Sequence, residues 1–173
     1  MQREHDVATI DAPGQKYIAD DNHNRVRKVT PDGTITTVIG DGTAASTGDG
    51  GPASEARVND PQGVVVDRAG NLYVSEYGGN SKPAAGNRIR RISPDGIVTT
   101  FAGTGRDGLA GIPGPAMRAD IPQPGMLAIG PDGALYVQDE DYGRILRLDL
   151  ATRQVTVRAG TPNGVTVSVT VPS

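Results

Sequence analysis

The chain has 173 residues, of which 36% are hydrophobic and 3% aromatic, with 24 glycines, 13 prolines and no cysteine. This composition favours short strands joined by tight turns over helical bundles, which tolerate little glycine or proline. The net charge of −3 argues against nucleic-acid binding, and the lack of cysteine excludes disulfides, thiolate metal sites and a cysteine nucleophile. No apolar run approaches the ~20 residues of a membrane-spanning helix, and the polar residues 1–6 do not resemble a signal peptide.

Two short sequence patterns occur three times along the chain. The first reads DAPGQKYIAD at 11–20, DRAGNLYVSE at 67–76 and GPDGALYVQD at 130–139. The second follows each copy of the first and reads RVRKV at 25–29, RIRRI at 88–92 and RILRL at 144–148. Such self-similarity indicates a repeat architecture, in which each unit buries its apolar face against its neighbours.

Each repeat contains four short apolar stretches separated by Gly, Pro, Asn and Asp, residues that suit tight turns. Twelve short strands with a period of roughly 60 residues predict an all-β protein of the β-propeller class, built from four-stranded antiparallel blades. The predicted blades cover residues 7–40, 61–103 and 124–160.

The sequence also predicts the start of a fourth blade. Residues 162–165 (PNGV) resemble a blade opening, and valines alternate with Thr and Ser over 164–171, as in a strand with one apolar face. Three blades cannot close a ring, because propellers have about four to eight. A fragment, a truncated gene or an oligomer would each account for this, so we expect self-association or further blades to complete the ring.

Several motifs recur in a fixed order: GDGGPA at 48–53, PQGV at 61–64, GNLYV at 70–74, NRI at 87–89 and PDG at 94–96. Over residues 7–160 the chain resembles bacterial NHL-repeat proteins, and NHNRV at 22–26 is similar to the stretch that gives this family its name. The resemblance implies a β-propeller, commonly six-bladed. It implies no single activity, because NHL propellers serve as sensor domains, as protein or RNA binders and occasionally as lyases. It suggests an extracytoplasmic protein, although the sequence leaves the compartment unknown.

The long connections are predicted to share one end of the blades. In an antiparallel four-stranded blade, the link between the second and third strands lies at the same end as the link to the next blade. The long segments 41–60, 78–86 and 104–123 are all links of these two kinds. Because long loops carry function disproportionately, we expect this end to be the binding face.

Residues that differ between repeats are the better binding candidates, because features shared by all repeats serve the repeat itself. Five such residues fall at or near the tips of the links between second and third strands: His23, Tyr77, Glu140, Asp141 and Tyr142. A solvated loop position is the alternative interpretation of His23.

One repeated position carries three carboxylates, Asp20, Glu76 and Asp139. They could hold a divalent cation such as Ca²⁺ or Zn²⁺ in a central channel. The alternative, which we favour, is that each accepts hydrogen bonds from backbone or arginine groups within its own blade. We likewise expect Tyr17, Tyr73 and Tyr136 to pack between blades.

The sequence therefore predicts a non-catalytic module that presents loops to a protein or small-molecule ligand, without a cofactor. The alternative is a propeller enzyme of the lyase or lactonase type that uses a divalent metal. Basic residues of the third strands could suggest RNA binding, but the acidic net charge and the lack of an exposed aromatic run make nucleic acid an unfavoured partner.

Overall fold

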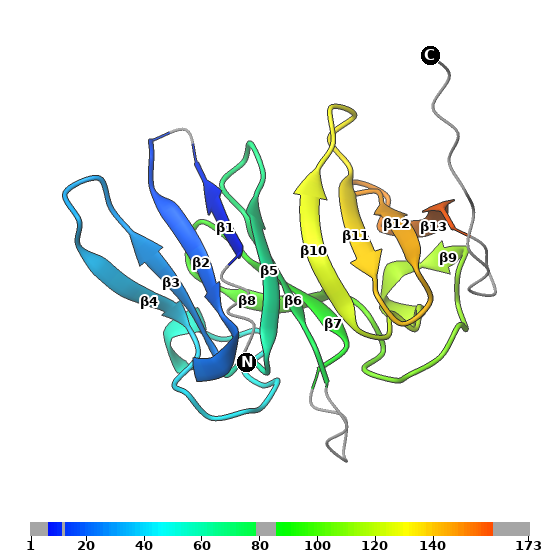
Figure 1. Cartoon of the computed structure of the whole chain (residues 1–173), viewed down its shortest axis with the longest axis horizontal. Helices are drawn as coiled ribbons and strands as arrows, with labels where there is room; N and C mark the ends of the chain where they lie inside the picture. The colour runs from blue at the N-terminus through cyan, green and yellow to red at the C-terminus, as the bar shows by residue number, and fades with distance from the viewer. Residues whose placement is uncertain (1–6, 12, 79–85, 161–173) are drawn as a thin grey trace.

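The computed structural model describes residues 7–11, 13–78 and 86–160. These residues form three antiparallel sheets arranged as an open fan (Figure 1). The chain is thus an all-β, incomplete propeller, as the repeats predict. The predicted strand at 164–171 lies outside the described residues. Within them, no helix is long and apolar enough to cross a membrane.

Each blade is a meander of four strands in chain order. Blade 1 contains β1 (Val7–Ile10), β2 (Lys16–Asp20), β3 (Arg25–Val29) and β4 (Ile35–Ile39). Blade 2 contains β5 (Pro61–Val66), β6 (Leu72–Glu76), β7 (Arg88–Ile92) and β8 (Val98–Ala102). Blade 3 contains β10 (Pro124–Ile129), β11 (Leu135–Asp139), β12 (Arg144–Leu148) and β13 (Gln154–Ala159).

A side-chain clamp closes the turn between the first and second strands of a blade. Asp67 accepts backbone hydrogen bonds from Ala69 and Asn71, and its other oxygen accepts one from the Tyr73 hydroxyl at 3.2 Å. Gly70 has φ of +83°, a left-handed conformation that favours glycine. The repeated tyrosine therefore holds the turn while its ring packs between blades.

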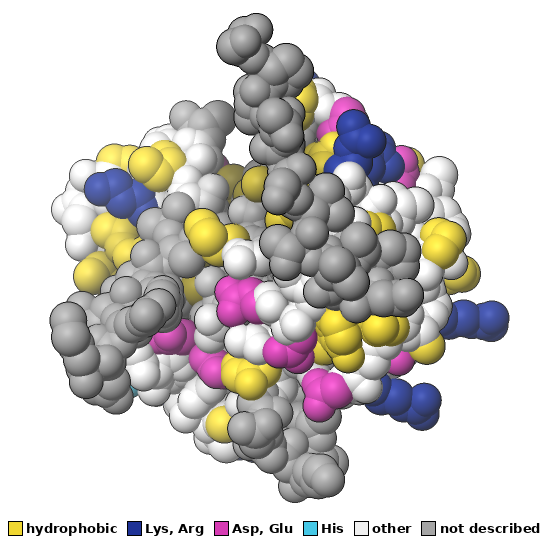
Figure 2. All heavy atoms as spheres, turned by 45° about the vertical axis from the view of Figure 1, so that its right-hand side comes forward, with side chains coloured by type: hydrophobic (Ala, Val, Ile, Leu, Met, Phe, Trp, Pro, Cys, Tyr) yellow, Lys and Arg dark blue, Asp and Glu magenta, His cyan; other side chains and the backbone are white. Residues whose placement is uncertain are grey.

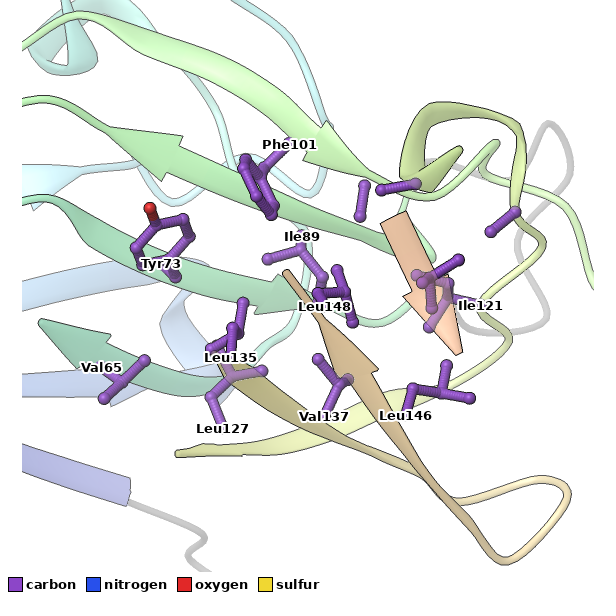
Figure 3. Close-up of a cluster of buried hydrophobic side chains, with 14 residues drawn as sticks. Val65, Tyr73, Ile89, Phe101, Ile121, Leu127, Leu135, Val137, Leu146 and Leu148 are labelled. Carbon is purple, nitrogen blue, oxygen red and sulfur yellow. The ribbon is translucent and has the colours of Figure 1, made fainter. Parts of the chain in front are cut away.

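Two apolar clusters lie between the blades and hold the fan together. Blades 1 and 2 share one cluster, which includes Tyr17, Val26 and Val74. Blades 2 and 3 share the other, in which Tyr73 meets Phe101 edge-on with ring centroids 5.2 Å apart (Figure 3). The tyrosines of the first two repeats thus pack between blades as predicted, whereas Tyr136 lies on the face of blade 3 that has no neighbouring blade in the described part of the chain.

An additional edge segment, absent from the sequence-based prediction, pairs with the last strand of two blades. The short strand β9 (Gly114–Pro115) pairs antiparallel with β13, and residues 50–53 pair in the same way with β8. Each edge segment continues into a 3₁₀ turn, η2 (Ala53–Glu55) or η3 (Ala116–Arg118), that begins directly after a proline. Blade 1 has no such segment within the described residues, so the outer edge of β4 is unpaired there.

The long connections 41–60 and 104–123 lie at one end of the fan, and the tight turns lie at the other (Figure 1). The remaining 3₁₀ turn, η1 (Asp21–His23), is at the same end as the long connections. This agrees with the strand-order prediction, although most of the third long segment, 79–85, is outside the described residues. We call this side, with residues 59–60, 77–78, 104–107 and 140–142, the loop end.

Candidate functional site

Asparagine side chains join neighbouring blades at the loop end. Asn24 Oδ1 accepts a hydrogen bond from the backbone N–H of Asp60 at 2.8 Å, just before blade 2 begins. The equivalent Asn87 accepts from Gly78 N–H at 3.0 Å and from Gln123 N–H at 3.4 Å, just before blade 3 begins. Both asparagines are left-handed, with φ of 50° and 55°. These contacts set the position of the loops that surround the candidate site.

Tyr77 lies beside the end of the link that precedes blade 2, held by contacts of its backbone groups. Its N–H donates to the Asp60 carbonyl at 3.1 Å, and its own carbonyl accepts from Asn59 Nδ2 at 2.6 Å. On the blade 3 side, Asn87 Nδ2 donates to Asp107 at 2.5 Å, and Gln123 Nε2 donates to Glu140 at 3.1 Å. The connections of all three blades therefore meet around one tyrosine.

The surroundings of Tyr77 are strongly acidic. Burial raises the pKa of Tyr77, and the negative charges of Asp141, Asp60, Asp107 and Glu140 raise it further. Burial, followed by the charges of Asp107 and Asp139, likewise raises the pKa of Asp141. Figure 2 shows acidic side chains gathered near the middle of the face that it presents. These carboxylates repel one another, and a cationic group placed among them would offset that repulsion. The position would therefore stabilise a bound cation.

The structure brings together Tyr77, Glu140 and Asp141 of the five predicted residues. Tyr142 lies on the same hairpin tip as the two acids, with its ring 5.3 Å from the Arg144 guanidinium carbon. His23 lies on the tip of blade 1, where its Nδ1 is 2.6 Å from Asp20 Oδ1 and its side chain is 68% exposed. The prediction missed Asp60 and Asp107, which belong to the connections between blades. The available signal was the Asn that precedes the third strand of blades 1 and 2, Asn24 and Asn87, which holds these connections.

Comparison with known proteins supports the fold. No protein-family model matches the chain. Teneurin-1 of Mus musculus is 36% identical over 123 residues, which cover 66% of this chain but only 4% of that protein. A protein of unknown function from Bacteroides thetaiotaomicron is 27% identical, with a TM-score of 0.63 over 84% of this chain and 33% of its own.

An auxiliary nutrient binding protein of the same bacterium has a TM-score of 0.62 at 20% identity, over 88% of this chain and 37% of that one. These structural neighbours are β-propellers, so the described blades have the arrangement of consecutive propeller blades. The matches include both a mouse protein and bacterial ones, and the bacterial type suggested by the motifs stays a prediction.

Two of the three repeated carboxylates are paired with arginine. Glu76 is fully buried and accepts hydrogen bonds from Arg90 at 3.3 Å and from Ser46 Oγ at 2.5 Å. Asp139 is fully buried and pairs with the Arg144 guanidinium, whose Nε lies 2.8 Å from it. Within the described ranges, no group of three His, Cys, Asp or Glu side chains could hold a metal ion. Guanidinium groups therefore take the place that a cation would occupy beside these two acids.

This arrangement predicts that neither Ca²⁺ nor Zn²⁺ stabilises the protein through these carboxylates. A ligand that binds only the native state must raise the melting temperature. We expect the melting temperature to be unchanged in differential scanning fluorimetry when either ion is added in excess. A rise that disappears in the Asp20→Asn variant, which leaves the two buried ion pairs intact, would contradict this prediction.

Proposed function

We propose that the chain is an NHL-type partial propeller that acts as a non-catalytic interaction module and binds a protein or small-molecule ligand at its loop end. The observation that carries the proposal is the meeting of loops from all three blades around Tyr77, beside Asp60, Asp107, Glu140 and Asp141. Rigid blades that position variable loops are a common basis for recognition. The resemblance to teneurin-1 and to a nutrient binding protein is compatible with such a role.

The chemistry of the loop end favours a ligand that carries amine or guanidinium groups. Asp107, Glu140 and Asp141 are exposed, so a cation can reach them without rearrangement of the blades. Tyr77 and Tyr142 add aromatic faces, on which a cation gains further attraction. The same acidity opposes phosphate and therefore nucleic acid. The enzyme alternative, a lyase or lactonase that uses a divalent metal, gains no support from the buried ion pairs described above.

A lysine tetrapeptide amide is a suitable probe for NMR titration of the ¹⁵N-labelled chain. We expect amide shifts to concentrate at residues 60, 77, 107 and 140–142, and binding to weaken as salt is added. Tyr77→Ala, Tyr142→Ala and Asp141→Asn should each weaken binding while the melting temperature stays close to that of the native protein. A glutamate tetrapeptide should produce no shifts.

His23→Ala is the matched control within this end of the molecule, because His23 lies on the tip of blade 1 and contacts Asp20 instead of the acidic group. The sequence-based prediction gave it a binding role. Because its ring contacts Asp20 of its own blade, we expect its substitution to leave binding of the probe unchanged. Shifts confined to the turns at the opposite end, such as the turn at residues 67–70, would overturn the proposal.

A further inference from the structure

Blade 2 binds its edge segment through backbone pairing with β8. Gly50 N–H donates to the Val98 carbonyl at 2.8 Å, and Val98 N–H donates back to the Gly51 carbonyl at 3.0 Å. Ala53 N–H then donates to the Gly96 carbonyl at 2.8 Å. Val98 is fully buried in this arrangement, as is the equivalent Val155 of blade 3.

An ion pair and a threonine hydroxyl also fix the edge segment to the face of blade 2. Arg90 Nη2 lies 2.8 Å from Asp49 Oδ1, and the Thr100 hydroxyl donates to Asp49 Oδ2 at 2.6 Å. Arg90 also donates to the carbonyl of Thr47 at 3.1 Å, and its side chain is only 1% exposed. Arg90 and Thr100 are register partners on β7 and β8, so the two strands present them side by side.

Blade 3 fills the corresponding positions with apolar residues. Leu146 and Val157 are register partners on β12 and β13, as Arg90 and Thr100 are in blade 2. Ile112 occupies the position of Asp49 in the aligned connection and packs against the same cluster as Leu146. Each blade is therefore matched to its own edge segment, polar in blade 2 and apolar in blade 3.

Blade 1 has the same arginine and threonine pair as blade 2, but no aspartate contacts that pair within the described residues. Arg27 and Thr37 are register partners on β3 and β4, and Arg27 Nη1 donates to the Thr37 hydroxyl at 2.8 Å. This is the one hydrogen bond of the Arg27 side chain within residues 7–11, 13–78 and 86–160. Ile35, the counterpart of Val98, is 58% exposed. Arg27 and Ile35 line a shallow groove on the outer face of blade 1, together with Ile18, Asp20, His23, Arg25 and Val29.

We propose that this groove and the outer edge of β4 bind an extended segment that carries an aspartate, in the way blade 2 binds residues 46–53. The aspartate would pair with Arg27 and Thr37, and the backbone would extend the sheet by one strand. Burial of Ile35 would accompany both interactions. This groove shares no residue with the loop end as defined above, so the inference does not rest on the proposed function.

The chain itself supplies the probe and its control. The probe is a fluorescein-labelled peptide of residues 44–56 (AASTGDGGPASEA), and the control is the aligned peptide of residues 107–119, which has Ile112 in place of Asp49. In fluorescence anisotropy, the full chain should bind the first peptide saturably. An Asp49→Asn peptide and the control peptide should each bind at least about tenfold more weakly, as expected when a charge-assisted hydrogen bond is lost.

A double substitution of blade 1 tests the specificity directly. Arg27→Leu with Thr37→Val reproduces the apolar pair of blade 3, so this variant should lose the preference for the aspartate peptide and bind the 107–119 peptide more tightly. Because Arg27 and Thr37 are not in the buried core, circular dichroism should show an unchanged fold. NMR shifts on β4 should mark the bound site.

A free peptide can bind too weakly to detect, so a second form joins residues 44–56 to the N-terminus through a flexible Gly-Ser linker, which raises the effective concentration to about millimolar. Protection of the β4 amides from hydrogen exchange in this fusion, lost on Arg27→Leu, supports the proposal. The absence of binding in both forms overturns it, as does binding that is indifferent to Arg27. Sedimentation that shows a second copy of the chain on this edge, displaced by Arg27→Leu, also overturns it.

Discussion

Replacement of Arg90 by leucine is expected to destabilise the protein by roughly 3–5 kcal/mol at pH 8, the cost of leaving a buried charge without its partner. Glu76 is fully buried and would retain the Ser46 hydroxyl, and the edge segment would lose its contact between Arg90 and Asp49. Leu146 of blade 3 shows that leucine fits the equivalent position, so the loss reflects charge rather than shape. Urea unfolding measures the effect.

The loss should depend on pH in a defined direction. Burial raises the pKa of Glu76 to about 7, and the charge of Arg90 acts in the opposite direction. A raised pKa means that the stability contributed by Glu76 is full below its ordinary pKa and falls as pH rises through the folded value. Without Arg90 the pKa rises further, so the cost of Arg90→Leu should be clearly smaller at pH 5 than at pH 8.

The matched control is the double variant Arg90→Leu with Glu76→Gln, which removes the titrating group. Its stability should change less between pH 5 and pH 8 than that of the single variant. An equal cost of Arg90→Leu at both pH values would show that Glu76 does not titrate in this range, and the interpretation of the buried pair would be wrong.

Truncation of Ile89 to alanine should cost about 2–5 kcal/mol, because it leaves a cavity between blades 2 and 3. Ile89, on β7, is fully buried in the cluster shown in Figure 3. The same truncation at Ile35, which is 58% exposed on β4, should change stability by no more than about 0.5 kcal/mol. Thermal or urea unfolding of the two variants compares one side chain in two environments.

Similar losses for the two variants would contradict the fold described here, because an open fan exposes the face of blade 1 that carries Ile35. A large loss at Ile35 alone would mean that something covers this face in solution. Sedimentation of the native chain at the concentration of the unfolding experiment identifies whether that cover is a second copy.

The blades could be predicted from the sequence because their signals are local. The repeated tyrosine, the Gly-containing turns and the alternating apolar residues specify each strand within about ten neighbours of the chain. Register follows, since a shift of one residue would move Ile89 from the core to the opposite face. The edge segments escaped prediction because Gly50 and Gly51 have no side chain to show an apolar pattern.

The site was less predictable, because its contacts join distant parts of the chain. Pairing of Glu76 with an arginine follows from its repeated position, but the contact of Arg90 with Asp49 spans 41 residues and depends on how the connection folds back. Asp60 and Asp107 approach Tyr77 only because Asn24 and Asn87 hold the connections. Residues chosen for their variability therefore included His23, whose ring contacts Asp20 of its own blade.

The edge segments also define where this protein could be divided or recombined. The four strands of blade 2 are not a complete structural unit. The segment that pairs with the outer edge of β8 begins near Ser46, in the link that follows blade 1. A graft that starts at Pro61 would leave the backbone hydrogen-bonding groups on the outer edge of β8 unpaired. A graft that starts at residue 46 would include the segment that pairs with them. The unit that can be transplanted, duplicated or deleted without loss of backbone pairing is thus offset by about fifteen residues from the visible blade.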